Sequence, residues 1–135
     1  MKAIFLASVP ASIAVIGLVC YFFGMFVVFV ISPIKNAKSF GVQPVDNSGK
    51  AEIGVYYGGM SLALAVLLVY LTIATKTAFF SLVCGMILST TIFLCRVIFV
   101  TIDKAWKCPY TKLAIPAEGF FVVALWICYI IAKNV

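Results

Sequence analysis

Four long apolar segments constrain the fold of this chain more than any other feature of its sequence. They run over residues 4–31, 53–74, 78–102 and 115–132. An α-helix needs about 20 apolar residues to cross the hydrocarbon core of a bilayer, and each segment is close to that length or longer. Hydrophobic residues make up 65% of the chain and charged residues only 10%, whereas about a quarter of a soluble domain is charged. The sequence therefore predicts an all-α membrane protein with four transmembrane helices in an antiparallel up-and-down bundle.

The segments between the apolar runs set the expected limits of the helices. Residues 33–50 hold several turn-forming residues and no periodic apolar face, which indicates a loop. The turn "TKT" at residues 75–77 is short enough to make its two neighbours an antiparallel hairpin. We expect helices at about residues 4–31, 52–75, 78–102 and 115–133. Pro116 then falls in the first turn of the last helix, and one transmembrane domain spans residues 1–135.

The composition also excludes several kinds of site. The chain contains no histidine, which excludes haem ligation by histidine, histidine-based zinc sites and histidine general bases. Its five cysteines form no CxxC pair, and four of them lie inside apolar segments, so we interpret them as small buried residues. No serine–base pair or metal-ligand spacing is present. We therefore expect a protein without catalytic activity, and without a metal ion or other cofactor.

The positive charge of the chain lies at the ends of the predicted helices. The formal net charge is +6, but lysines at helix ends are typical of anchors in anionic headgroups. We therefore expect the lipid bilayer as a partner and no binding to nucleic acid. Six lysines lie in loops one and three and three on the other side: Lys35, Lys38, Lys50, Lys104, Lys107 and Lys112 against Lys2, Lys76 and Lys133. The positive-inside rule then predicts that loops one and three are cytoplasmic and that both termini lie outside.

The third apolar segment repeats a small residue at every fourth position, at Thr77, Ser81, Gly85 and Ser89. Such a stripe is the usual way in which helices approach one another closely in lipid. At about 100° per residue, Arg96 lies roughly 20° from both Gly85 and Ser89 on the helix surface. We therefore predict that Arg96 faces the interior of the bundle, as ionisable groups in membranes usually do.

Two glutamates are expected at the depth of Arg96. Glu52 opens the second helix and Glu118 lies one turn into the fourth, and both helices begin on the side where the third one ends. A charged group within a bilayer is expensive unless it is paired. We predict that Glu52 and Glu118 flank Arg96, with the hydroxyl group of Tyr56 or Tyr57 nearby. This polar cluster is interpreted first as a lock for the bundle, with a ligand or ion site, or a proton path, as the alternatives.

The stretch "AEIGVYYGGMS" at residues 51–61 places three glycines close to Glu52. Gly58 and Gly59 are expected to allow close approach of a neighbouring helix beside this carboxylate. Gly54 and Gly58 form a second small-residue face, roughly opposite Glu52, which could pack against the first helix or against another chain. The sequence therefore leaves open both self-association and contact with other membrane subunits.

The order of these residues resembles a family of small four-helix bacterial membrane proteins that is described only as a domain of unknown function. The similarity rests on "YYGGMSLALAVLL" in the second helix, "CRVIFVTID" at the end of the third and "PAEGFFVVALW" in the fourth. It covers about residues 50–126 and extends more loosely to DoxX-like four-helix proteins. The residues that recur in the family correspond here to Tyr57, Gly58, Gly59, Arg96 and Glu118. The resemblance implies a four-helix protein of the bacterial inner membrane and no particular activity.

Three kinds of function remain open from the sequence. A non-catalytic structural or accessory subunit of a larger membrane complex is favoured by the small size and the two small-residue faces. Binding or transport of a small lipophilic or anionic ligand, at an intramembrane Arg–Glu pocket, is the alternative. An enzyme acting on lipid or quinone is the weakest, because no catalytic constellation is present. Paired apolar replacement of Glu52, Arg96 and Glu118 would separate the first two, since only a structural lock tolerates it.

Overall fold

The computed structural model describes residues 2–134, with side chains from Val9 onward. The chain is 89% helical, and no strand is present in the described residues. This result confirms the predicted all-α class. It follows from the apolar composition, because a helix satisfies its backbone hydrogen bonds within one segment and so can cross a bilayer.

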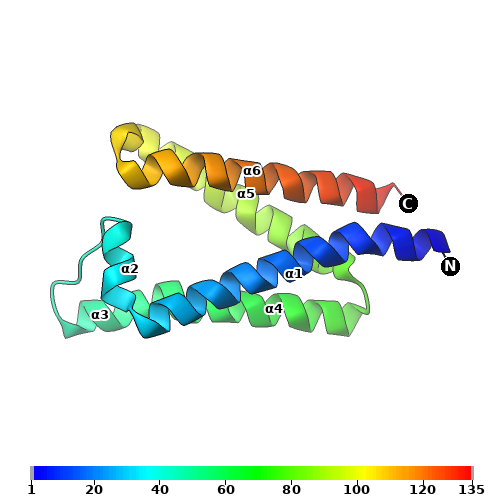
Figure 1. Ribbon diagram of the computed structural model, residues 1–135, viewed down its shortest axis with the longest axis horizontal. Coiled ribbons are helices and arrows are strands. Elements are labelled where there is room, and N and C mark those ends of the chain that lie inside the picture. Colours follow the sequence, from blue (N-terminus) through cyan, green and yellow to red (C-terminus); the bar gives the residue numbers. More distant parts are fainter. Residues whose placement is uncertain (1, 135) are drawn as a thin grey trace. The chain divides into compact units, whose positions relative to one another are not determined.

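Four helical segments are long and apolar enough to cross a membrane, and the protein is a multi-pass helical membrane protein (Figure 1). The long α-helices are α1 (Lys2–Ile31), α4 (Met60–Thr75), α5 (Ala78–Ile102) and α6 (Pro109–Lys133). A shorter helix, α3 (Asn47–Ile53), runs through the π-helix Gly54–Gly59 into α4 and completes the second span. The fold therefore agrees with the number of spans that hydropathy predicts.

The contacts within the chain define two units, which are described separately. One unit combines the start of α1, up to Val15, with the chain from Leu71 onward. The other unit is Ile16–Tyr70, which holds the rest of α1, the first loop, α3 and most of α4. The single domain that the sequence suggests stays a prediction.

Two of the four spans begin earlier than predicted. The second begins at Asn47 rather than at residue 52, because Asp46 is an N-cap whose Oδ1 accepts the N–H of Gly49 at 2.7 Å. The fourth begins at Pro109 rather than at residue 115, since proline fits the first helical position, where its missing N–H is not needed. Pro116 consequently lies inside the helix and not in its first turn, which corrects the prediction.

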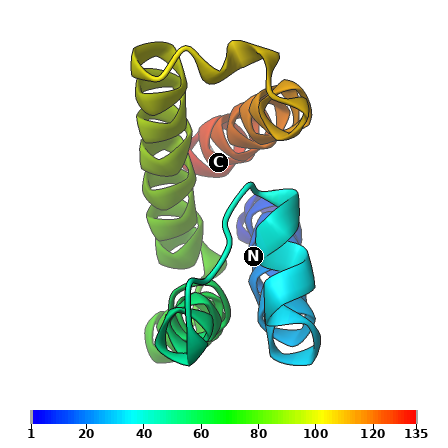
Figure 2. The same cartoon turned by 90° about the vertical axis from the view of Figure 1, so that its left-hand side faces the viewer.

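The first loop contains a short helix that the sequence analysis missed, α2 (Pro33–Ser39). It stands across the end of α1 instead of continuing its axis (Figures 1 and 2). The side-chain amide of Asn36 fixes this bend by donating to the carbonyl oxygens of Val28, at 2.9 Å, and Ser32, at 2.7 Å. Val28 lies in the last turn of α1, and Ser32 is the residue between the two helices. Each carbonyl oxygen also accepts a backbone N–H, so the amide of Asn36 adds a second bond to each.

The end of α2 is a Schellman motif centred on Gly41. Gly41 has φ 79°, a left-handed conformation that favours glycine. Its N–H donates to Lys38 O, and the N–H of Val42 donates to Ala37 O, each at 3.0 Å. The turn brings Val42 back onto the buried Ala37. This short helix is therefore closed at its C-terminus by backbone bonds and an apolar contact.

An aromatic stack forms the core of the unit Ile16–Tyr70. The ring of Phe29 on α1 lies 5.1 Å from that of Tyr57 and 5.8 Å from that of Phe40, measured between centroids. Phe40 and Tyr57 are 6.0 Å apart, so the three rings form one group. Stacked aromatic pairs add about 0.5–1.5 kcal/mol beyond the burial of their area. The stack joins α1, the end of α2 and the π-helix.

The stretch with three glycines is the π-helix itself. Its wider turn is closed by the N–H of Met60, which bonds to the carbonyl of Val55. The hydroxyl group of Ser61 donates to Tyr57 O at 2.6 Å and so satisfies a carbonyl in the widened turn. A regular α-helix, with 100° per residue along the whole span, was expected from the sequence and does not include this turn.

Of the three glycines, Gly58 alone makes the close helix contact that was expected. It is buried, and a Cβ there would lie 3.4 Å from Phe29 Cβ. No atom of the described chain lies within 4 Å of a Cβ built at Gly54 or Gly59, apart from their own helical surroundings. Contact of the face that holds Gly54 with another chain stays a prediction, as does a close helix approach at Gly59.

We expect Gly58→Leu to destabilise the protein by about 1–3 kcal/mol, because the larger side chain would overpack the contact with Phe29. Gly59→Leu is the matched control, since the neighbouring position is open. Gly58→Ala should be nearly neutral, since 3.4 Å is an ordinary contact. Melting temperatures in mild detergent measure all three. Equal losses for Gly58→Leu and Gly59→Leu would show that the helix contact is not the cause.

Candidate functional site

The helices α5 and α6 form an antiparallel hairpin that positions the candidate site (Figure 1). Their contacts continue along both helices. The rings of Phe79 and Tyr129 stack at 5.8 Å, and Trp126 Nε1 donates to Thr90 Oγ1 at 3.2 Å. Nearer the connecting turn, Gly119 lets Phe93 approach to 3.4 Å from the position of its absent Cβ. These contacts hold the two helices in register without the help of a charged group.

An ion pair joins the two helices near this turn. Arg96 Nε lies 2.7 Å from Glu118 Oε2, a distance typical of a charge-assisted hydrogen bond. Arg96 is six residues from the end of α5 at Ile102, or about 9 Å along the helix axis. Both side chains remain partly exposed, at 28% for Arg96 and 27% for Glu118. The structure therefore brings together two of the predicted site residues, within a membrane span and without burying them.

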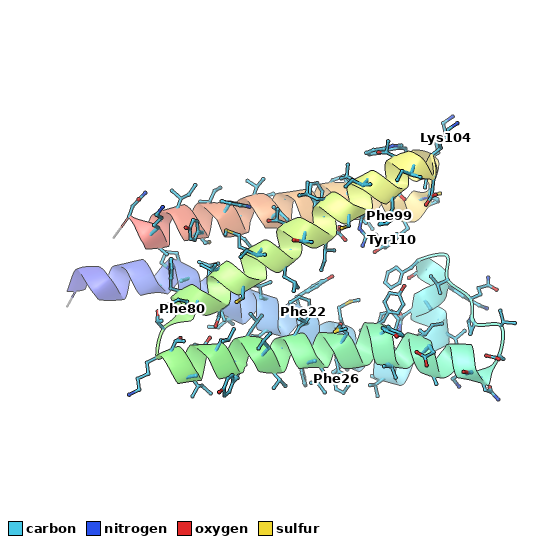
Figure 3. The ribbon with its side chains drawn as sticks, turned by 180° about the vertical axis from the view of Figure 1, so that it is seen from behind. Phe22, Phe26, Phe80, Phe99, Lys104 and Tyr110 are labelled. Atoms are coloured by element: carbon cyan, nitrogen blue, oxygen red, sulfur yellow. The ribbon has the colours of Figure 1, made fainter. Side chains whose placement is uncertain are left out.

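Tyr110 is a third member of this site that the sequence analysis missed. The Cζ atom of Arg96 lies 5.3 Å from the centroid of the Tyr110 ring, within the range of a cation–π interaction. Figure 3 shows Tyr110 at the end of the hairpin where the turn joins α5 to α6. Starting the last helix at residue 115 left Tyr110 in a loop. The signal that could have found it is Pro109, which begins α6 and places Tyr110 in the first turn.

The remaining predicted members belong to the unit Ile16–Tyr70. Glu52 and Tyr56 have exposed side chains at the start of the second span. The ring of Tyr57 takes part in the aromatic stack with Phe29 and Phe40. An approach of Glu52, or of either tyrosine hydroxyl, to Arg96 therefore stays a prediction.

The small-residue stripe of α5 packs closely only over its first half. Ser81 and Gly85 are buried, and the hydroxyl groups of Ser81 and Thr72 on α4 lie 2.8 Å apart in a hydrogen bond. Thr77 instead caps the helix, accepting the N–H of Phe79 at 3.2 Å. Ser89 is only partly buried. The stripe thus leads to a close helix contact, as predicted, but the contact ends before the level of Arg96.

The exposure of the cysteines contradicts the prediction that they are small buried residues. Cys20, Cys84, Cys95 and Cys108 are exposed and Cys128 is intermediate, so the chain itself does not bury them as expected. Three of the exposed four lie within helical spans, where lipid chains are as apolar as a protein interior and give no reason to turn a thiol inward. Among the described residues, no group of three or more Cys, Asp and Glu side chains could hold a metal ion.

Comparison with family models, with curated proteins and with solved structures finds no match for this chain. The resemblance to the four-helix family of unknown function therefore stays a prediction. The ion pair, its exposure and its neighbours are therefore the observations that bear on the function of the site.

We expect Arg96→Met and Glu118→Leu each to destabilise the protein by about 1–3 kcal/mol, because each leaves one charge unpaired in a membrane span. The double variant should be within about 1 kcal/mol of the parent, since it removes both charges. Denaturant titration of the purified protein in detergent gives the double-mutant cycle. Additive losses in the double variant would mean that the two residues do not act as a pair.

We expect Tyr110→Leu to cost about 0.5–1 kcal/mol more than Tyr110→Phe, because phenylalanine keeps the aromatic face beneath the guanidinium group and leucine does not. The same two substitutions in the Arg96→Met background provide the control, where their difference should shrink. A difference that persists without Arg96 would assign Tyr110 to packing alone.

Proposed function

We propose that this chain is a non-catalytic accessory or structural subunit of a larger membrane complex. The observation that carries the proposal is the ion pair between Arg96 and Glu118, which lies inside a membrane span with more than a quarter of each side chain exposed. Ionisable groups in membranes almost always face the interior of a bundle or a water-filled cavity. A partner that covers this pair would provide such an interior.

The burial pattern of α5 supports the same conclusion. All buried residues of this helix lie between Ala78 and Met86. From Ile87 to Ile102 none is buried, and the ion pair falls in this uncovered half. A charged side chain within a membrane span is costly unless it faces a bundle interior or a water-filled cavity. Association at this half of α5 is therefore favourable, and no enzyme chemistry is required to explain the charges.

A second function is favoured by the chemistry of the same residues. The guanidinium group of Arg96, between a carboxylate and an aromatic ring, suits a small lipophilic or anionic ligand that would cover the pair in place of a protein. We keep binding or transport of such a ligand as the alternative. The two functions differ in what remains attached to the chain after gentle extraction.

The finer localisation is part of the proposal. We infer a bacterial inner membrane, in agreement with the sequence resemblance, and a cytoplasmic position for loops one and three. The excess of lysines in these two loops supports that orientation.

A crosslinking experiment tests the proposal on the native chain. Ile92 lies about 40° from Arg96 around α5, whereas Ile87 lies about 140° from Ile92, and both side chains are exposed. We expect a photo-crosslinking residue at Ile92 to capture one defined protein in membranes, and the same residue at Ile87 to capture little. A tagged pull-down in mild detergent, with mass spectrometry of proteins and small molecules, identifies what is bound.

Two outcomes would overturn the accessory-subunit proposal. One is equal capture at Ile87 and Ile92, which would indicate random contact in the membrane. The other is a solitary chain that carries one defined small molecule, lost in the Arg96→Met/Glu118→Leu variant. That result would establish the ligand-binding alternative.

A further inference from the structure

The end of the α5–α6 hairpin carries an excess of positive charge to which the proposed complex assigns no partner. Lys104 and Lys107 lie in the connecting turn and Lys112 follows in the first turns of α6, with Asp103 as the nearby carboxylate. All four side chains are exposed. Within the described residues no ion pair involves any of these lysines. We call Lys104, Lys107 and Lys112 the basic end of the hairpin.

The position of Lys112 is electrostatically unfavourable for the protein alone. The N-terminus of a helix carries partial positive charge, and acidic residues are preferred there. The first turn of α6 has no acidic residue, and its N-cap, Cys108, makes no side-chain hydrogen bond to it. Lys107 and Lys112 therefore add positive charge to an end that is already positive. An anion outside the chain would offset this repulsion.

Exposed apolar side chains lie directly beside the basic end. Ile102 closes α5 and is 66% exposed, and Leu113, next to Lys112, is 74% exposed. Trp106, between Lys104 and Lys107, is also exposed, and tryptophan is enriched where a membrane meets water. Figure 3 shows Lys104 projecting beyond the end of the hairpin. The basic end thus combines cations with apolar surface where two membrane spans finish.

We propose that the basic end binds the phosphate headgroup of an anionic phospholipid, whose acyl chains cover the apolar residues beside it. The lysines supply the charge, while Arg96 already has a carboxylate partner in Glu118 and is not required. A phospholipid matches both parts of this surface, since its phosphate suits the lysines and its acyl chains suit Ile102 and Leu113, whereas a soluble phosphate matches the lysines alone. The site is separate from the ion pair, and its test does not depend on the proposed function.

Native mass spectrometry of the full chain in mild detergent tests this inference. The probes are phosphatidylglycerol and phosphatidylcholine with identical acyl chains. We expect phosphatidylglycerol to be retained in preference. Each basic residue near an anionic lipid is worth about a fivefold change in affinity, so the variant Lys104→Gln/Lys107→Gln/Lys112→Gln should lose roughly 100-fold of this retention.

The chain offers a matched control for the loss of charge. Lys35→Gln/Lys38→Gln/Lys50→Gln also removes three exposed lysines, from α2 and α3, and should keep the preference for phosphatidylglycerol. Lys104→Arg/Lys107→Arg/Lys112→Arg keeps the charge and should retain the lipid. Circular dichroism of all three variants verifies the helical fold. If the glutamine variant does not fold, the single variants Lys107→Gln and Lys112→Gln replace it, each with a loss of about fivefold.

Three results would overturn the inference. Equal loss in the two glutamine variants would show that net charge, and not the basic end, attracts the lipid. Equal retention of phosphatidylglycerol and phosphatidylcholine by the parent would show no headgroup preference. Displacement of phosphatidylglycerol by millimolar inorganic phosphate would assign the basic end to a soluble anion instead of a lipid.

Discussion

A bilayer offers no water to the backbone, and the rest of this structure depends on that constraint. Every N–H and C=O group in a span must find its partner within the protein. The caps of this chain show how closely the constraint is met. Asn36 donates to carbonyl oxygens at the junction of α1 and α2, and Asp46 and Thr77 cap the starts of α3 and α5. Ser61 donates to a carbonyl oxygen in the widened turn of the π-helix. No buried side-chain nitrogen or oxygen among the described residues lacks a hydrogen-bond partner.

The pair of Arg96 and Glu118 is the exception to the apolar interior, and its geometry explains why it is tolerated. The two charges are joined by a short hydrogen bond, with the Tyr110 ring beside Arg96. The ring stack of Phe79 and Tyr129, the approach of Phe93 to Gly119 and the hydrogen bond from Trp126 to Thr90 already align the two helices. The ion pair therefore adds specificity to a contact that apolar packing has formed. Removing one charge would leave the other exposed to lipid.

Hydropathy and local turn chemistry predict this fold with different success. The limits of α5 agree with the sequence because a cap, Thr77, and a three-residue turn mark its start. The starts of the second and fourth spans were missed because hydropathy was followed, although Asp46 and Pro109 signal the true beginnings. Helix α2 is a single short segment, held by the Asn36 amide, the turn at Gly41 and its contact with the aromatic stack, which periodicity cannot reveal. The pairing of Arg96 with Glu118 could be predicted from their depth in the membrane and their angular positions on the two helices. The contact of Tyr110 with Arg96 could not, because the helix that holds Tyr110 was expected to begin later.

The π-helix Gly54–Gly59 has a consequence for how this chain tolerates changes in length. Its widened turn holds one residue more than an α-helical turn. The side chains of α3 and α4 therefore do not follow one continuous α-helical register, although the two helices follow one another along the span. A single-residue deletion within Gly54–Gly59 would restore an ordinary α-helical turn and leave the faces on both sides in place. Helix α5 has no widened turn that could absorb the same deletion. A deletion in its middle would therefore rotate Arg96 away from Glu118 by about 100°. The second span is therefore where this protein can lose a residue without changing which side chains face each other.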